Sequence, residues 1–453
     1  MRYFDRCSRG ALILFLVSTI YKIMARAMTT RPKPGGRIGK GYRRSFSSVG
    51  RKARECGGVQ RRDFLRAATA VLGSSLTANS VANAAELESQ RKYFQRFPTL
   101  FAPLYGEATR KTVKYPIGEN IWALEQNLEL GPLETPLRCV VIRLNNGSLW
   151  VHAPLAPTEE FFQLVESCGE TVSHVVVPTY ALEHKVFVKD ALIRWQNASL
   201  WTSPGQFSFP IQSMPDDIVF GKSVSGVLSM SDVDTTSQKI PWIDEIQYET
   251  LVAGTFQIGG SPTKFYETAF FHKRSKSLIV TDSVAQVPLR IPELSDPDKL
   301  LLVSKRSTAD PQPDDTPEAR QIGWEKTALL VSYFFPEHEE LDPDAGFGVV
   351  TWTDGWHDNF NALAGRLLVP PVVRTLIYAQ NPMKVREWVN RVVARWEFEQ
   401  IVPAHFQAPI KASPREFEKV FAFLEDDNID PFPANDLARG LKPISDLALN
   451  TLN

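Results

Sequence analysis

The amino-acid sequence predicts an α/β fold built from layers of sheet and helix, and three observations support this prediction. Residues 136–154 are typical of a β-hairpin, because two β-rich arms flank Asn146-Gly147, a dipeptide that readily takes the positive φ of a tight turn. Within 161–168, apolar residues recur at i, i+3, i+4 and i+7, which indicates a helix. A strand at 173–178, a polar loop, a second helix and another strand follow. This order is the first half of a layered α/β domain.

The boundaries of the first half follow from local signals. An early strand is expected at 117–124. Thr158 can cap the first helix through its hydroxyl, and Gly169 is expected to end that helix. A helix around 189–195 and a strand at 199–201 complete this half.

The second half repeats the alternation. Residues 248–258 predict more sheet, and 265–284 predict two strands joined by a charged turn at 273–276. Residues 383–396 carry valines and a tryptophan on one helical face, and they lead into a short strand at 398–403. A final helix is expected at 414–424.

One stretch interrupts this pattern. Residues 293–346 are rich in Asp, Pro and Glu, and we interpret them as a surface insertion that contains a hydrophobic helical patch at 328–335.

The first 84 residues read as targeting segments rather than as part of the fold. Residues 1–27 resemble a signal peptide, with arginines before a short apolar run and Ala25-Arg26-Ala27 as a cleavage signal. Residues 28–60 have nine Lys or Arg and one acid, the composition of a transit peptide. Residues 61–84 resemble a twin-arginine signal, with Arg61-Arg62, an apolar run and Ala82-Asn83-Ala84 in order. The order predicts a plastid (chloroplast) protein of the thylakoid lumen, with one domain at 85–453 whose core is 113–425.

Charge is segregated in the same way. Residues 1–84 hold 17 Lys or Arg and three Asp or Glu, which leaves 34 basic and 48 acidic residues in the rest. An acidic domain disfavours nucleic acid and anionic lipid as partners, so we expect none, and no membrane span is expected in the mature, soluble domain. An unknown small molecule or plastid protein is the expected partner. Cys139 and Cys168 are interpreted as small buried hydrophobic residues, with a bridge between them as the alternative.

Three polar side chains follow apolar strands: His184, Asp282 and His405. The Thr281-Asp282 pair after an apolar strand and the sequence Val-Pro-Ala-His at 402–405 resemble the metallo-β-lactamase superfamily. Residues 113–425 are similar to an uncharacterised branch of it from plants, algae and cyanobacteria, a domain of unknown function. This resemblance implies a four-layer αββα sandwich of metallo-β-lactamase type with the acidic, Pro-rich insertion.

The resemblance also implies a degenerate metal site. The superfamily has a His-x-His-x-Asp-His motif where this chain has Thr-Tyr-Ala-Leu-Glu-His at 179–184, so the ligands of the first metal are missing. A ligand set for the second metal is retained as Glu183, His184, Asp282 and His405. Two carboxylates and two imidazoles suit one zinc, iron or manganese ion. The alternative is that the same residues bind loop backbone groups and hold no metal.

Two further histidines are candidates for supporting roles. His152 is at the position where active relatives often have an aspartate that orients ligands. His272 is a candidate substitute ligand or proton donor, and the alternative is a satisfied polar turn residue. No catalytic residue is assigned.

The functional prediction has two branches. The first is a thylakoid-lumen protein with a degenerate metallo-β-lactamase-like domain, without dinuclear hydrolase chemistry, that binds or assists other plastid components. The second is a mononuclear metal-dependent hydrolase that uses a metal-bound water as nucleophile.

Overall fold

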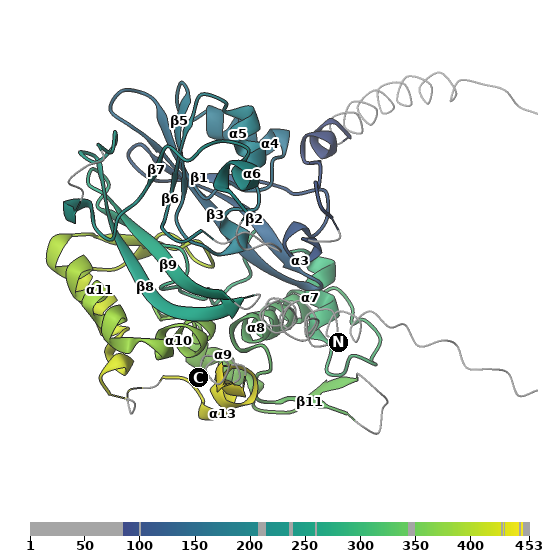
Figure 1. The fold of residues 1–453 in the computed structure, drawn as a ribbon. Coiled ribbons are helices and arrows are strands. Elements are labelled where there is room, and N and C mark those ends of the chain that lie inside the picture. The colour runs from purple at the N-terminus through teal and green to yellow at the C-terminus, as the bar shows by residue number, and fades with distance from the viewer. Residues whose placement is uncertain are drawn as a thin grey trace, which may run out of the picture. The chain divides into compact units, whose positions relative to one another are not determined.

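The structure is a computed structural model, and it describes residues 85–98, 101–206, 214–234, 239–258, 261–342, 349–426, 429, 431–443 and 445–446. The chain divides into two units, and the larger one, residues 1–30 and 91–453, contains every element described below (Figure 1). The three predicted targeting segments, 1–27, 28–60 and 61–84, lie outside the described residues.

The first sheet has seven strands in sequence order, with antiparallel pairing from β1 to β4 and parallel pairing from β4 to β7. Its strands are β1 Val113–Gly118, β2 Ile121–Leu130, β3 Leu133–Arg143, β4 Leu149–His152, β5 Val172–Val177, β6 Ser199–Thr202 and β7 Gly226–Val227. The helices α4 Glu159–Glu166, α5 Val188–Arg194 and α6 Asp216–Phe220 lie between the parallel strands along the chain, as the crossover connections of such strands require. Thr158 caps α4 as predicted, since its hydroxyl accepts from the Phe161 N–H.

The second sheet has five strands in the order β14, β13, β10, β9, β8. Its strands are β8 Ile246–Ile258, β9 Ser261–His272, β10 Ser277–Ile279, β13 Gln400–Val402 and β14 Ile410–Lys411. β10 and β13 pair in parallel, and the other neighbours are antiparallel. The helices α11 Pro382–Arg395 and α12 Pro414–Lys419 belong to this half.

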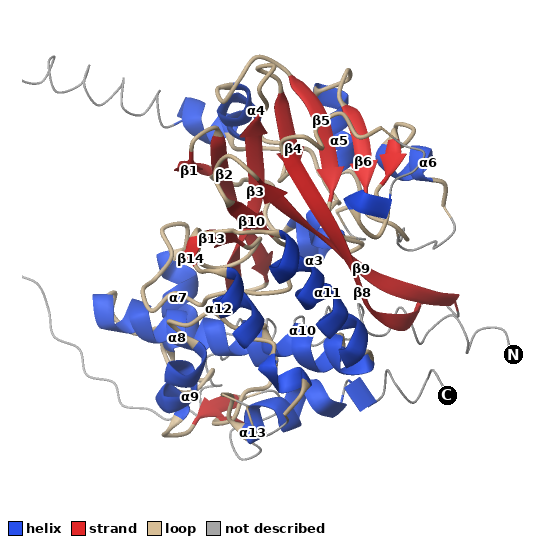
Figure 2. Cartoon of the chain, turned by 90° about the vertical axis from the view of Figure 1, so that its left-hand side faces the viewer, coloured by secondary structure: helices blue, strands red, loops and turns tan. Residues whose placement is uncertain are grey.

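The two sheets pack face to face with helices on their outer faces (Figure 2). Between the sheets, Trp150 and Val176 of the first contact Tyr248 and Phe270 of the second in one buried cluster. A second cluster joins the other face of the first sheet to α4 and α5, and a third joins the second sheet to α11 and α12. The predicted four-layer αββα fold is therefore confirmed.

The insertion is not confined to the surface, which corrects that part of the interpretation. It contains α7 Pro297–Ser304 and α8 Pro317–Tyr333, and the buried residues of α8 include Trp324 and Leu330. These helices form a core cluster with residues of α9 Trp356–Leu363 and α10 Pro371–Leu376. The insertion is buried because the apolar residues of α8, including those of the predicted hydrophobic patch, are removed from water by packing on these helices. The small sheet of β11 Glu339–Leu341 and β12 Val350–Trp352 follows α8 along the chain.

Two local predictions are wrong for identifiable reasons. The single strand expected at 117–124 is a tight hairpin, because Asn120 takes a positive φ of 60° between β1 and β2. Gly169 does not end α4, whose C-cap is Ser167. A Cβ at Gly169 would lie 2.6 Å from Leu149 Cδ2 and 2.9 Å from the Gly147 carbonyl oxygen, so this glycine allows a close backbone approach instead.

Within the described residues, no helix is both long enough and apolar enough to cross a membrane. Cys139 and Cys168 are buried free cysteines, as the simpler interpretation predicted.

The shorter elements of the chain are α3 Ala102–Tyr105, η1 Leu182–His184, η2 Asp232–Asp234, η3 Tyr378–Gln380, η4 Ala422–Leu424, α13 Ala434–Asp436 and η5 Leu437–Leu441.

Candidate metal site

Three strand ends bring the predicted site residues together. η1 follows β5 and carries Glu183 and His184, while Asp282 follows β10 and His405 follows β13. Because β10 and β13 are parallel neighbours, their carboxyl ends meet at one edge of the second sheet. The loop after β5 reaches the same edge, since the Thr268 N–H of β9 donates to the Pro178 carbonyl at 2.7 Å.

Asp282 lies between two imidazoles. Its Oδ2 is 3.4 Å from Nε2 of His184, and its Oδ1 is 3.4 Å from Nε2 of His405. One ligand atom each of Glu183, His184 and His405 lie within 4.8 Å of one another. These four residues are the set that the sequence predicted, and the structure places them in one cluster.

The orientation of His405 is set by the backbone. Its Nδ1 lies 3.0 Å from the carbonyl oxygen of Pro136 on β3, and because a carbonyl only accepts, Nδ1 carries the proton. In the neutral ring, Nε2 then presents a lone pair toward the Asp282 carboxylate. Two acceptors face each other in this way only if a proton or a cation lies between them, and carbonyl-oriented imidazoles are typical of metal ligands.

His184 provides the test of fit for a metal. Its side chain is buried, and neither ring nitrogen has a hydrogen-bond partner among the described residues. A buried polar group without a partner costs roughly 1–3 kcal/mol. A cation held by Nε2 of His184, Nε2 of His405 and the two carboxylates would satisfy Nε2 of His184, though not its Nδ1, and this donor set fits one metal ion.

Electrostatics favour the charged form of the cluster. Burial raises the pKa of Asp282, but the imidazoles of His184 and His405 outweigh it and hold that pKa well below its usual value. Burial lowers the pKa of His184, and the Asp282 carboxylate reverses this, so the pKa of His184 is raised.

Glu267 on β9 is a site residue that the sequence interpretation missed. Its Oε1 accepts the backbone N–H groups of Thr281, Asp282 and Ser283 at 2.8, 3.2 and 3.2 Å, which fixes the backbone that carries Asp282. Burial, with a contribution from Asp282, raises the pKa of Glu267 to about 7. Its Oε2 is buried and has no partner among the described residues. The available signal was a carboxylate in the strand segment 265–271, next to aromatic residues.

Arg138 on β3 is a second missed residue, and it holds the loop that carries His405. Its guanidinium donates to the carbonyl oxygens of Pro403 and Phe406 and pairs with Glu125, and its backbone N–H donates to the Ala404 carbonyl at 2.9 Å. The side chain is 1% exposed. Nothing in the local sequence marks this arginine, because its partners in the His405 loop lie more than 260 residues away.

Two residues at the start of the loop after β5, Thr179 and Tyr180, attach this loop to β9. The hydroxyl of Thr179 donates to the Tyr266 carbonyl at 2.9 Å. The ring of Tyr180 packs edge-on against Phe265, with 4.8 Å between centroids. Both positions therefore serve packing.

The two supporting histidines lie in different places. His152 is buried, stacks on Trp150 with 5.7 Å between centroids, and has no hydrogen-bond partner for either ring nitrogen among the described residues. Burial and the nearby His184 lower its pKa to about 3. His272 pairs with Ser277 at the beginning of β10, whereas Asp282 follows the end of that strand, and its Nδ1 lies 2.7 Å from Ser275 Oγ. The structure does not bring His272 to the cluster.

Comparisons with known proteins add the following. The family described as a domain of unknown function, DUF4336, matches residues 118–423. A metallo-beta-lactamase from Pontibacter korlensis is similar in structure, with 10% identity, coverage of 69% of this chain and 99% of that chain, and a TM-score of 0.32. A metal-soaked Flv1 flavodiiron core from Synechocystis is also similar in structure, with 10% identity and a TM-score of 0.36. The match covers 71% of this chain and 62% of that chain. No curated protein matches the sequence.

Proposed function

This chain belongs to the family of the domain of unknown function DUF4336, and on that premise we propose that it binds one divalent metal ion and uses it in hydrolysis. The proposed ligands are Glu183, His184, Asp282 and His405. The observation that carries the proposal is the pair of imidazole Nε2 atoms at 3.4 Å from the two oxygens of Asp282, with His184 otherwise unpartnered among the described residues.

The donor set limits the metal. Two imidazoles and two carboxylates suit zinc, ferrous iron or manganese, and fewer oxygens are present than calcium prefers. When bound, such an ion would polarise a substrate oxygen and lower the pKa of a water molecule that it holds. The chain's own residues prepare the site. Pro136 and Arg138 orient His405, and the Oε2 atom of Glu267 can take up a proton near neutral pH because its pKa is raised to about 7.

Elemental analysis tests the metal directly. The protein is purified without chelator beside His184→Ala, with His357→Ala as the control because His357 is a half-exposed histidine outside the cluster. We expect about one metal per chain in the wild type and the control, and near none in His184→Ala. Metal at equal stoichiometry in all three proteins would refute the proposed ligands.

A second candidate function is favoured by one observation. Thr179 and Ala181 stand where the superfamily motif has its first two histidines, and the Thr179 hydroxyl instead donates to the Tyr266 carbonyl, which supports a domain without a first metal and without dinuclear chemistry. A degenerate domain of this kind would bind or assist other plastid components. In that case Asp282→Ala and His405→Ala would lower the melting temperature, and no ester, thioester or phosphodiester would be hydrolysed by the wild type. Unchanged melting in both variants would count against this candidate.

The proposed location is the plastid thylakoid lumen. The support is the order of the three targeting segments at 1–27, 28–60 and 61–84, of which the last carries the twin arginine. Import into isolated thylakoids tests it. We expect cleavage near Ala84 and loss of import in the Arg61→Lys, Arg62→Lys double variant. Uncleaved protein, or unchanged import of the variant, would exclude the twin-arginine route.

A further inference from the structure

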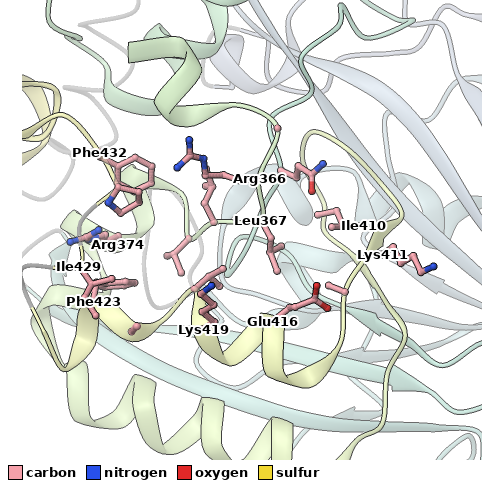
Figure 3. Close-up of a pocket in the computed structure, with 18 residues that line it drawn as sticks. Arg366, Leu367, Arg374, Ile410, Lys411, Glu416, Lys419, Phe423, Ile429 and Phe432 are labelled. Carbon is pink, nitrogen blue, oxygen red and sulfur yellow. The ribbon is translucent and has the colours of Figure 1, made fainter. Parts of the chain in front are cut away.

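A second place in the fold combines apolar walls with positive charge. A cavity of about 640 Å³ lies among α12, the segment 365–369 and the residues 431–432 (Figure 3). None of the four proposed metal ligands lines it. Its volume falls within the roughly 300–1,000 Å³ of typical small-molecule sites. The cavity is therefore a candidate binding site separate from the metal cluster.

One side of the cavity is apolar. Phe423, Ile429 and Phe432 gather on this side, as Figure 3 shows, and Leu367 and Val420 also line the cavity. The guanidinium of Arg374 lies 4.1 Å from the centroid of the Phe423 ring and 5.8 Å from that of Phe432. A cation held over aromatic faces keeps its charge at the apolar wall.

The charged residues of the lining are mostly positive. The four cations are Arg366, Arg374, Lys411 and Lys419, and Glu416 is the one carboxylate among the lining residues. Glu416 is already engaged, because its Oε2 accepts from the backbone N–H and the hydroxyl of Ser413, both at 2.7 Å, in the capping box of α12. The Ser413 hydrogen bonds and, to a smaller extent, the nearby Lys411 lower the pKa of Glu416, so this carboxylate serves the capping box and Lys411.

Two of these cations are available for a ligand. Within the described part of the chain, neither Arg366 nor Lys419 forms an ion pair, and Arg366 donates only to the carbonyl oxygen of Asn361 at 3.1 Å. In Figure 3 the two side chains stand on opposite sides of the cavity, with Lys419 rising from α12. Each can donate charge-assisted hydrogen bonds to an anionic group in the cavity.

Together these features define the chemistry of the ligand. A small inorganic anion would satisfy the cations and leave the aromatic wall in contact with water. A neutral apolar molecule would cover the wall and take the cations out of water without a partner, which is unfavourable. We propose that this cavity binds a small amphiphile, an apolar chain or ring that ends in a carboxylate or phosphate group.

Isothermal titration of the purified protein tests the proposal with defined probes below their micelle concentrations. Laurate and dodecyl phosphate carry the two acidic heads, dodecanol has the same chain without charge, and dodecyltrimethylammonium has the opposite charge. We expect one laurate or dodecyl phosphate per chain, and binding at least about tenfold weaker for dodecanol and dodecyltrimethylammonium. The tighter of the two anions identifies the head group. Binding of all four probes with equal affinity would overturn the proposal, and so would no binding of either anion.

Variants locate the site. In the Arg366→Glu, Lys419→Glu double variant we expect anion affinity to fall about tenfold or more, because two attractive contacts become repulsive. Ala422→Leu fills the lining without changing charge and should also weaken binding. Lys239→Glu is the control, since Lys239 is exposed and does not line the cavity. Circular dichroism confirms folding of each variant. Unchanged binding in both cavity variants would overturn the proposal.

A membrane surface is the competing source of such head groups. Vesicles of phosphatidylglycerol are sedimented with the protein in the same buffer. We expect the protein to remain in the supernatant while monomeric laurate binds. Sedimentation with the vesicles, in the absence of binding to monomeric amphiphile, would overturn the proposal in favour of a lipid surface.

Discussion

Two carboxylates in the half of the molecule that holds the second sheet differ in their burial and in their partners. Glu249 on β8 is 0% exposed, and it is bound by Arg391 at 3.0 Å, by Ser231 Oγ at 2.7 Å and by Arg395. Asp282 faces only the two imidazoles at 3.4 Å, and the histidine on one side of it has no hydrogen-bond partner among the described residues.

This difference in partners separates a carboxylate that only stabilises the fold from one that could ligate a metal ion. A guanidinium remains charged at every accessible pH and cannot ligate a metal, so the Glu249 cluster is closed and serves to join β8 to α11. An imidazole can lose its proton and then offers a lone pair. The Asp282 cluster is therefore the one in which an ion can replace a proton, although both carboxylates belong to the same half of the molecule.

The largest effect is expected at the Glu249 cluster. Glu249→Ala leaves the guanidinium of Arg391 without its carboxylate and removes one of the two carboxylates of Arg395, which keeps Asp232, and it should lower the free energy of unfolding by about 3–5 kcal/mol. Urea unfolding measures this, and the metal content should not change. Glu399→Ala, which removes an exposed pair with Lys276, is the control and should cost under about 1 kcal/mol. An equal loss of unfolding free energy in both variants would show that the buried Glu249 stabilises the fold no more than an exposed ion pair does.

At Asp282 we expect the opposite result. Zinc at 100 times its dissociation constant should stabilise the wild type by about 2.7 kcal/mol, because only the folded chain holds the ligands together. Asp282→Asn should show no stabilisation by zinc. Urea unfolding with zinc and with chelator provides both numbers. If zinc stabilised the variant as much as the wild type, Asp282 would not be a zinc ligand and, like Glu249, would serve only the fold.

Acid sensitivity is expected from His152, which borders the Asp282 cluster. Its pKa is lowered to about 3 in the folded chain, so the unfolded chain binds more protons between about pH 3 and 6.5, and stability falls as the pH drops through this window. At pH 5 the loss is about 2 kcal/mol. His152→Phe keeps the stacking on Trp150 and should abolish this part of the loss. Urea unfolding in chelator at pH 5 and pH 8 measures the difference, and an identical pH dependence in variant and wild type would contradict the prediction.

The smallest effect is expected at Arg138. Arg138→Lys keeps the charge, but one ammonium cannot bond the carbonyl oxygens of both Pro403 and Phe406, so the His405 loop loses a contact. We expect metal affinity about tenfold weaker, or about 1.4 kcal/mol, measured by competition with a chelator. Arg143→Lys on the same strand is the control, since Arg143 bonds only Asn120 in an exposed turn. Equal affinity of both variants would show that Arg138 does not position His405.

Much of the molecule could be predicted from local sequence. The hairpin around Asn146-Gly147, the capped helix after Thr158 and the strands that end before His184, Asp282 and His405 all follow from periodicity and turn chemistry, and the structure confirms these elements. The family and the αββα fold followed from the resemblance of the strand-end residues, and both are confirmed. The targeting segments remain predictions.

Tertiary structure alone decided which polar groups meet. Arg138 lies 265 residues along the chain from the Pro403 carbonyl that it binds, and Glu267 lies 14 residues from the Thr281 N–H that it accepts. No local period or motif encodes such contacts. The burial of α8 and the apolar cavity beside α12 likewise depend on which faces of separate helices are brought together. A sequence specifies its strands and turns through neighbouring residues, whereas partners of buried charges are chosen by the packing of the whole domain, because only there is water excluded from both groups at once.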